Sequence, residues 1–445
     1  MSVGTAIIER MNDDPLGVLA RVEEVPGRLV GAVEAATARL GTGDLIGALR
    51  ALEELKNMAS ALQVLVAVCF DRQQRADQAR CGVPGERLGR GIAEQIALAR
   101  RESPARGAVF LGVATALVAQ MPRTLDAMAV GVLTEHRAQI LVHETGCVSP
   151  EVRAQVDAVV AGDLGRLSRL GTRRLADLVR GETYRHDPAA VVARIGHAES
   201  ERFVALRPAP DCMARLTALL PVAQGVAALA ALHHSAQDAR LAGDPRTRAQ
   251  IMADNLVTRI TGQSTPDAVP VALHLVMPAD TLLEGGDRPG RIHGHGPIPA
   301  PLARRLIAAA PAVASWVRKL YARPKGGLVA MESEARFFPD RLAEFITLRD
   351  QSCRTPYCDA QIRHIDHIVP YYEGGPTTAT NGQGLCERCN HAKQAPGWNQ
   401  AVLLTELHHD WHTGHPHSGE AREIREVLIT TPTGHHYASP TPDDG

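Results

Sequence analysis

Residues 349–398, RDQSCRTPYCDAQIRHIDHIVPYYEGGPTTATNGQGLCERCNHAKQAPGW, hold two close pairs of cysteines. Four residues separate Cys353 from Cys358, and two separate Cys386 from Cys389. Two short-spaced pairs joined by a longer loop supply four thiolates that can converge on one tetrahedral Zn²⁺. Because this short unit has few apolar side chains, a structural metal would supply the stability that its core lacks. The sequence therefore predicts a structural zinc site in this segment.

Four shorter motifs follow one another in the same stretch. They are Asp-His-Ile-Val-Pro at residues 366–370, Gly-Gly at 374–375, Asn381, and Leu-Cys-x-x-Cys-Asn-x-x-Lys at 385–393. In this order they resemble the HNH endonucleases, whose nuclease core is a ββα-metal unit. The resemblance covers about 50 of the 445 residues. It implies a metal-dependent enzyme that hydrolyses DNA phosphodiester bonds and leaves 5′-phosphate and 3′-hydroxyl ends.

The resemblance also implies a role for individual residues. Phosphodiester hydrolysis needs a base that deprotonates water and a cation that stabilises charge on the phosphate and the leaving oxygen. His367 would be the base, since an imidazole titrates near neutral pH. Asp366 would bind the divalent metal from the opposite side of the same strand, and Asn381 would orient His367 through a backbone hydrogen bond across the loop. Asn390 would bind the same metal, and Lys393, nearly one helical turn further on, would contact a phosphate.

One position departs from the family pattern. HNH endonucleases normally carry a histidine directly after the last cysteine, where this chain has Asn390, with His391 one residue later. Helical neighbours point about 100° apart, so only one of the two can face the metal. We favour Asn390, because an amide oxygen suits hard Mg²⁺ or Mn²⁺. His391 is the alternative, and if neither residue binds, the nuclease is weak or inactive. His364 is expected at the surface, with a supporting or DNA-contacting role as its alternative.

Charge is balanced along the chain and within the module. The 445 residues include 48 Lys+Arg and 49 Asp+Glu, for a formal net charge of -1. This balance excludes a protein that coats DNA through bulk positive charge. The module at residues 349–400 has as many acidic as basic side chains and so has no basic patch. Contact with nucleic acid would fall on individual cations, with Lys393, Arg363 and Arg388 as the candidates.

The region before the module has its own resemblance. It is carried by residues 92–120 (IAEQIALARRESPARGAVFLGVATALVAQ), by MPRT at 121–124, by LTEHR at 133–137 and by G-x-GPIP at 294–299. These motifs resemble an actinobacterial helical family known only as a domain of unknown function (number 222), or the 13E12 repeat proteins. Members characteristically end in an HNH segment. The resemblance runs from about residue 47 to residue 398 and implies the domain order, but no activity for the helical part.

Apolar periodicity predicts helices through most of this region. In residues 45–70, apolar side chains recur three or four residues apart. Ser103-Pro104 and Asp187-Pro188 have the pattern of a helix N-cap followed by proline at the first helical position. Further helices are predicted at residues 94–101, 109–120, 134–143, 150–161, 187–201, 247–260, 301–321 and 339–349.

Other segments break the helical pattern. The stretch VPVALHLVM at residues 269–277 is β-branched and bounded by proline, so it predicts a strand that pairs with 327–331 in a small sheet. A Gly/Pro loop is predicted at residues 285–301. Near the C-terminus, residues 427–431 and 436–439 flank a turn and predict a hairpin.

Two features bear on location. Charged residues interrupt the first 30 residues and leave no apolar core of a secretory signal. The longest uncharged stretch, residues 216–237, contains proline, glutamines and histidines, so we interpret it as a buried helix or helix pair, not a membrane span. A cytoplasmic, soluble protein is expected.

The four single cysteines are expected to be core thiols; they are Cys69, Cys81, Cys147 and Cys212.

Together these patterns predict a mainly α protein. A large helical N-terminal domain with a small sheet precedes a C-terminal zinc-stabilised ββα-metal (HNH) nuclease module. The expected divisions are an N-terminal segment 1–45, a helical domain 46–335, the nuclease domain 336–400 and a tail 401–445. The expected partners are DNA and, through the helical domain, a second copy or another protein, with no membrane. The alternative function is a non-catalytic, zinc-stabilised DNA-binding protein of mobile-element origin.

Overall fold

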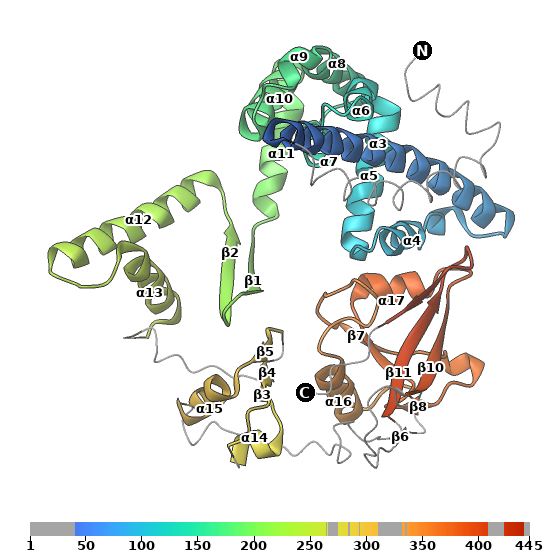
Figure 1. The fold of residues 1–445 in the computed structure, drawn as a ribbon, viewed down its shortest axis with the longest axis vertical. Helices are drawn as coiled ribbons and strands as arrows, with labels where there is room; N and C mark the ends of the chain where they lie inside the picture. Colours follow the sequence, from blue (N-terminus) through green and yellow to red (C-terminus); the bar gives the residue numbers. More distant parts are fainter. Residues whose placement is uncertain are drawn as a thin grey trace. The chain divides into compact units, whose positions relative to one another are not determined.

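The computed structural model describes residues 41–263, 265, 275–283, 285–292, 294–309, 332–333, 336–407 and 422–439. The chain divides into two compact units, Met1–Gly196 and His197–Gly445, shown in Figure 1. Each unit is described by itself.

The first unit is helical throughout its described residues. Its elements are α3 (Thr42–Arg80), the short η1 (Gly85–Arg87), α4 (Ile92–Ala99), α5 (Pro104–Gln120), α6 (Pro122–Ala129), α7 (Glu135–Glu144), α8 (Pro150–Ala161), α9 (Leu164–Leu167), α10 (Thr172–His186) and α11 (Pro188–Ser200), which ends just past the unit boundary.

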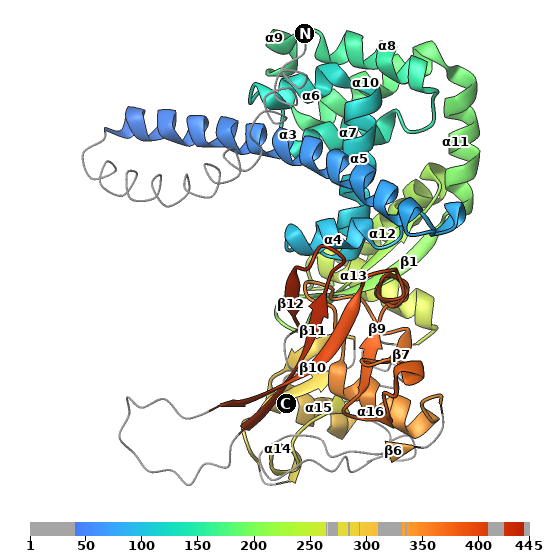
Figure 2. The same cartoon turned by 90° about the vertical axis from the view of Figure 1, so that its right-hand side faces the viewer.

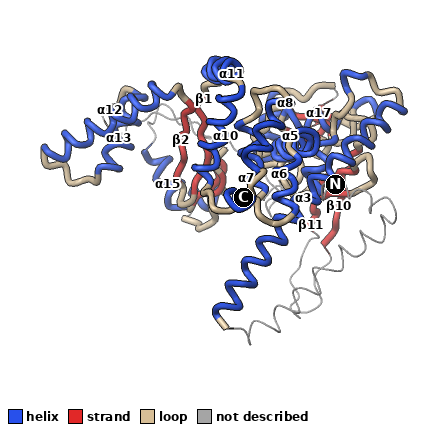
Figure 3. Tube along the Cα trace, turned by 90° about the horizontal axis from the view of Figure 1, so that it is seen from above, coloured by secondary structure: helices blue, strands red, loops and turns tan. Residues whose placement is uncertain are grey.

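Helix α5 is the centre of this unit. It packs against α3, α4, α6, α7 and α8, and Figure 3 shows it among α3, α6, α7 and α8. The core around it includes fully buried Leu117, Met121, Met128 and Leu133, with Phe110 2 % exposed. Burial of these large apolar side chains is the main stabilising contribution to the unit.

The helix starts predicted from the sequence are present. Ser103 accepts a hydrogen bond from the N–H of Arg106 and caps α5, with proline at the first position. Asp187 does the same for α11 through the N–H of Ala190, at 2.9 Å. Each cap satisfies a backbone donor that the helix leaves free at its start.

Residues of the family motifs have structural partners in this unit. The guanidinium of Arg100 pairs with both carboxylate oxygens of Glu135, at 3.1 and 3.2 Å. Arg137 donates to the carbonyl oxygens of Leu167 and Leu170, at 2.9 and 3.0 Å. These motif residues therefore serve to join helices.

Asp157 joins α8 to the start of α6. Its carboxylate is buried, at 1 % exposure, and accepts from the N–H of Arg123 at 2.8 Å and the N–H of Thr124 at 3.0 Å. The Thr124 hydroxyl donates to the same carboxylate. A side chain from another helix thus supplies the cap that α6 lacks in its own sequence.

We expect Asp157→Ala to destabilise the protein by about 2 kcal/mol, because it leaves buried backbone donors without an acceptor. Asp163→Ala removes a cap from the short α9, where the donor is exposed, and should cost about 1 kcal/mol or less. Urea unfolding of both variants beside the wild type measures the difference. Equal losses in the two variants would contradict a special role for Asp157.

The second unit begins with a hairpin that the sequence did not indicate. Strands β1 (Phe203–Ala209) and β2 (Met213–Leu219) pair antiparallel, and α12 (Val222–Leu241) and α13 (Arg248–Thr261) follow. The expectation of a buried helix or helix pair at residues 216–237 is right for the helix over most of this stretch, but wrong for its first residues and for its burial. The segment up to Leu219 pairs with β1, the helix begins after Pro221, and among its residues only Ala236 is buried.

A small three-stranded sheet comes next in the chain. It is formed by β3 (Leu275–Val276), β4 (Gly290–Ile292) and β5 (Gly296–Ile298), in that order, with α14 (Ala279–Leu283) between β3 and β4. The predicted Gly/Pro loop thus contains a hairpin. Of the predicted strand at 269–277, residues 269–274 lie outside the described residues, as does all of 327–331. Helix α15 (Ala300–Ala309) covers the described part of the helix predicted to end at residue 321.

The segment that holds the cysteines is a compact α/β arrangement. Its elements are β6 (Glu332–Ser333), α16 (Asp340–Asp350), β7 (His364–His367), the short η2 (Tyr371–Glu373), β8 (Thr377–Thr378), β9 (Gly382–Leu385) and α17 (Glu387–Lys393). β7 pairs antiparallel with β9, and β6 with β8. Two strands followed by a helix that packs on both of them give the ββα order expected for the module.

A C-terminal sheet completes this arrangement. Strands β10 (Asn399–Leu407), β11 (Arg422–Thr430) and β12 (His436–Ala438) are antiparallel neighbours (Figure 2). Val427 and Ile429 of β11 pack on Ile368, next to the end of β7. The buried Arg354 donates to the hydroxyl of Ser439 at 3.1 Å. The sheet therefore shares a core with the cysteine-bearing segment.

The remaining expectations concern single cysteines and membrane helices. The four single cysteines do not lie in the core: Cys81 is exposed and the other three are half-buried. Among the described helices, none alone has the length and apolarity of a bilayer span. The pair α5 and α6, bent by 108° at its break, meets that test by length and composition only.

Candidate functional site

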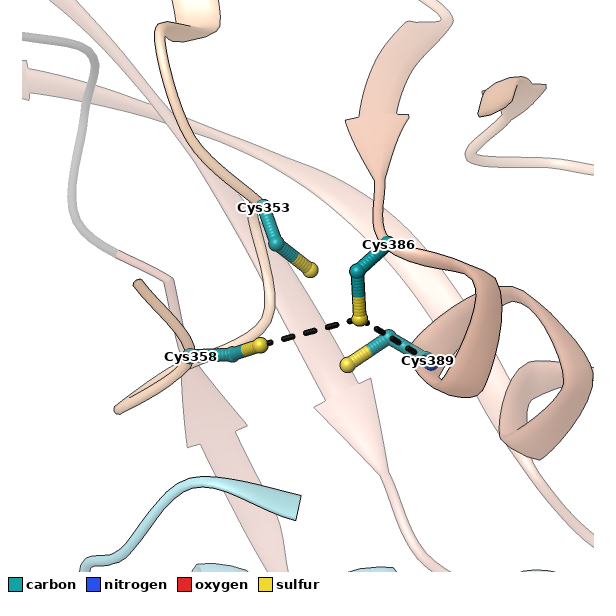
Figure 4. Close-up of side chains that lie close together, drawn as sticks. All are labelled: Cys353, Cys358, Cys386 and Cys389. Carbon is teal, nitrogen blue, oxygen red and sulfur yellow. Dashed lines mark hydrogen bonds between the residues drawn. The ribbon is translucent and has the colours of Figure 1, made fainter. Parts of the chain in front are cut away.

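Four cysteine sulfurs converge in the second unit, as Figure 4 shows. The Sγ atoms of Cys353, Cys358, Cys386 and Cys389 all lie within 4.8 Å of one another, and all four residues are buried. Cys386 is the N-cap of α17 and Cys389 lies in its first turn. The other two come from the loop after α16. Two segments that lie far apart in the sequence therefore each supply two sulfurs to the same cluster.

Four sulfurs at this spacing cannot all ionise unless a cation lies among them. Hydrogen bonding with Cys353 raises the pKa of Cys358 and of Cys389 and lowers the pKa of Cys386. Coordination to Zn²⁺ deprotonates thiols outright and so removes this conflict. A buried set of four sulfur donors fits a structural zinc ion.

The strands beside the cysteines are tied to the same framework. The Asp350 carboxylate accepts from the N–H of Gly384 at 2.7 Å. The N–H groups of Arg354 and Arg363 donate to the carbonyl oxygens of Gly384 and Leu385, both at 2.9 Å. The β7–β9 hairpin is thereby held from α16 and from both ends of the cysteine loop.

His367 ends β7 and is largely enclosed. It is 7 % exposed, and the Phe338 and Tyr371 rings lie 4.4 and 5.8 Å from its ring by centroid distance. Its Nε2 lies 2.8 Å from the hydroxyl of Thr377, which is itself 1 % exposed. Because Nε2 is engaged with the hydroxyl, Nδ1 is the ring nitrogen that remains for proton transfer.

The electrostatic environment keeps His367 neutral. Burial lowers the pKa of His367, and the positive charge of Lys393 lowers it further, while Asp366 opposes both effects. An imidazole with a pKa below its usual range is deprotonated at pH 7. This is the protonation state that a general base requires.

Asn381 closes the loop that follows β7. Its Oδ1 accepts from the N–H of Val369 at 2.9 Å, and its Nδ2 donates to the carbonyl oxygens of Val369 and Pro376, at 3.0 and 2.9 Å. A Cβ at Gly375 would collide with the Val369 carbonyl oxygen, and Gly374 has a φ of 88°. The Gly-Gly pair is thus required by a tight turn.

The residue in contact with the imidazole is one that sequence reasoning missed. Asn381 is expected to orient His367 through a backbone hydrogen bond across the loop, and its amide does bond the backbone of Val369 there. The hydrogen bond to the ring itself comes from Thr377. Thr377 lies between two residues named from the motif. Because Thr378 and Thr380 carry the same hydroxyl, the sequence offers no signal that selects Thr377 among them.

Asp366 on β7 and Lys393 at the end of α17 are in contact, and Asn390 lies three residues before Lys393 on the same helix. The Lys393 Nζ is 2.7 Å from Asp366 Oδ2 and also donates to the carbonyl oxygen of His367. The Asn390 Oδ1 is buried and has no hydrogen-bond partner. A carboxylate oxygen and an unpartnered amide oxygen are hard donors of the kind that Mg²⁺ and Mn²⁺ prefer, so these residues fit such an ion.

The other predicted contact residues lie at the surface. His391 is exposed one position after Asn390, and His364 is exposed at the start of β7. Arg363 and Arg388 are exposed as well. Lys393 differs from them, because its side chain is 8 % exposed and its ammonium is turned to Asp366.

Two family models match the chain. The model described as "Domain of unknown function (DUF222)" matches residues 49–350, and the model described as "HNH endonuclease" matches residues 351–395. The chain belongs to the DUF222 family. Its HNH segment is of a nuclease class. These matches and the four-cysteine cluster confirm the predicted family and the predicted fold class.

Curated relatives of this DUF222 protein occur in Mycobacterium tuberculosis. The uncharacterized protein Rv3776 is 31% identical over 152 residues, which is 33% of this chain and 24% of the relative. The uncharacterized protein Rv2100 is 31% identical over 207 residues, 45% of this chain and 30% of the relative. The chain thus spans only 24% to 30% of the length of these relatives. No solved structure matches it.

We expect the purified DUF222 protein to carry about one equivalent of zinc, held by the four sulfurs. Cys389→Ser should lose most of this zinc and lower the melting temperature, because the metal contributes folding free energy. Cys81→Ser, at an exposed single cysteine, is the matched control and should retain it. Elemental analysis and thermal unfolding provide the measurements. Full zinc content in Cys389→Ser would contradict the assignment.

Proposed function

We propose that this protein is a metal-dependent endonuclease that hydrolyses DNA phosphodiester bonds, with His367 as the general base. The observation that carries the proposal is the environment of His367. A buried imidazole with a lowered pKa is held by Thr377, Asp366 precedes it on β7, and α17, which packs on this strand, carries the unpartnered Oδ1 of Asn390. A neutral base next to a hard-cation site is the arrangement that phosphodiester hydrolysis needs.

In this proposal each side chain has a separate task. His367 Nδ1 accepts the proton of the attacking water, while Thr377 holds the ring through Nε2. Asp366 and Asn390 would hold the divalent cation, which neutralises charge on the phosphate and the leaving oxygen. The Asn381 amide keeps the loop closed, so that Thr377 stays within hydrogen-bond distance of His367.

Plasmid nicking by the purified protein with Mg²⁺ or Mn²⁺ tests the proposal. His367→Ala should lower the cleavage rate by about 10²–10⁴-fold, the usual contribution of a positioned base. His186→Ala, at the exposed end of α10 in the first unit, is the matched control and should cleave like the wild type.

The outcomes separate the two functions named from the sequence. Cleavage that is lost only in His367→Ala supports the enzyme. Equal cleavage by all three proteins excludes His367 as the base. Absence of cleavage in every protein, with zinc bound and DNA retained, would favour the non-catalytic DNA-binding protein.

The role of Thr377 predicts an asymmetry between two variants. Thr377→Val keeps the shape and removes the hydroxyl, so kcat should fall roughly tenfold to hundredfold while KM changes little, because the imidazole is misplaced. Thr377→Ser retains the hydroxyl and should recover most of the rate. Steady-state kinetics on a short duplex measures both constants. If valine and serine lower kcat equally, the hydroxyl does not position the base.

A further inference from the structure

Lys393 places a buried positive charge directly on the candidate metal site. It is the last residue of α17, its side chain is 8 % exposed, and its Nζ lies 2.7 Å from Asp366 Oδ2. The same ammonium donates to the carbonyl oxygen of His367. One turn earlier on the helix, the buried Asn390 Oδ1 has no partner. The carboxylate offered to a metal is therefore already neutralised by a side chain of the protein.

The charges in contact at this site do not favour a divalent cation in the protein alone. Asp366 and Lys393 cancel, and the Asn390 amide is neutral. Glu373, exposed on η2, adds a negative charge that acts on Lys393 without forming an ion pair. A divalent ion on Asp366 would be repelled by the nearby ammonium. Mg²⁺ sites in proteins commonly combine one or two carboxylates with substrate phosphates.

We propose that Lys393 couples metal binding to nucleic-acid binding. In the protein alone Lys393 holds Asp366. When a phosphodiester enters the site, its negative charge attracts the ammonium, and Asp366 becomes free for the divalent cation. The flexible four-carbon stem and three rotatable donors of lysine allow this change of partner. The inference rests on the proposed function and adds that the metal binds tightly only together with nucleic acid.

The coupling also gives Lys393 a definite partner in each state. The carbonyl oxygen of His367 accepts from the ammonium but carries no countercharge. A buried charge that is not paired is costly, so the side chain needs Asp366 whenever no phosphate is present. The phosphate contact expected from the sequence and the ion pair seen in the structure are then two positions of one side chain.

Mn²⁺ binding to the full-length, zinc-loaded protein tests the proposal without relying on activity. The signal of free Mn²⁺ in electron paramagnetic resonance is titrated with and without a short DNA duplex. All proteins carry His367→Ala, so that the duplex remains intact. A protein that carries Asp366→Asn together with His367→Ala lacks the proposed site. The Mn²⁺ that it binds, and that the duplex binds, is subtracted as background.

Three proteins are compared, and only the Lys393→Met protein is expected to differ from the other two. The His367→Ala protein should bind Mn²⁺ at least about tenfold more tightly with the duplex than without it, because the phosphate offsets the repulsion between the two cations. When Lys393→Met is combined with His367→Ala, the Mn²⁺ affinity without duplex should rise about tenfold, and the duplex should raise it little further. Added Lys56→Met removes an ammonium from an exposed pair on α3 and should behave like the starting protein.

Two results would overturn the coupling. One is an Mn²⁺ affinity that the duplex leaves unchanged in the starting protein; the other is an unchanged affinity in Lys393→Met without duplex. If Lys393→Met does not fold, as judged by zinc content and circular dichroism, Lys393→Gln replaces it with the same expectation. If the starting protein binds no more Mn²⁺ than Asp366→Asn even with duplex, the metal site itself is absent and the proposed function fails together with the coupling.

Discussion

Charge repulsion among four sulfurs is the constraint on which the site depends. Cys353, Cys358, Cys386 and Cys389 lie too close together to be thiolates without a cation between them. A zinc ion bound there would resolve this conflict and would join the loop after α16 to the first turn of α17. Helix α17 carries the Asn390 oxygen and the Lys393 ammonium, and β7 carries the imidazole. Such an ion would therefore stabilise the geometry of these groups without taking part in the proposed chemistry.

Neighbouring residues on β7 have opposite surroundings, and this separates their chemistry. His367 is enclosed by Phe338, Tyr371 and the Thr377 hydroxyl, so burial keeps it neutral. The preceding carboxylate points to the other side of the strand and stays half-buried beside an ammonium. Alternation along a strand is enough to place a buried imidazole and a half-buried carboxylate at adjacent positions. The two groups still interact, because Asp366 raises the pKa of His367 while its partner Lys393 lowers it.

Features that depend on residues close in sequence were predicted well, and features that depend on contacts between distant residues were not. Cysteine spacing indicated the sulfur cluster, and caps such as Ser103 and Asp187 indicated helix starts, because both depend on residues close in sequence. The β1–β2 hairpin was missed because the end of β2 was assigned to the uncharged stretch at residues 216–237, although Arg215 and Thr217 alternate with apolar neighbours. Thr377 was missed because its selection depends on how the loop closes. The packing of β11 on Ile368 joins residues about 60 apart, beyond the reach of any local pattern.

The limits of the HNH match do not coincide with the limits of the folded core around it. Asp350, which holds β9, belongs to the preceding family match, and Val427, Ile429 and Ser439 lie beyond residue 395. A recombination event that exchanged residues 351–395 alone would sever both sets of contacts. The folded unit that supports His367 therefore includes α16 and the C-terminal sheet. It is larger than the segment that carries the HNH motif.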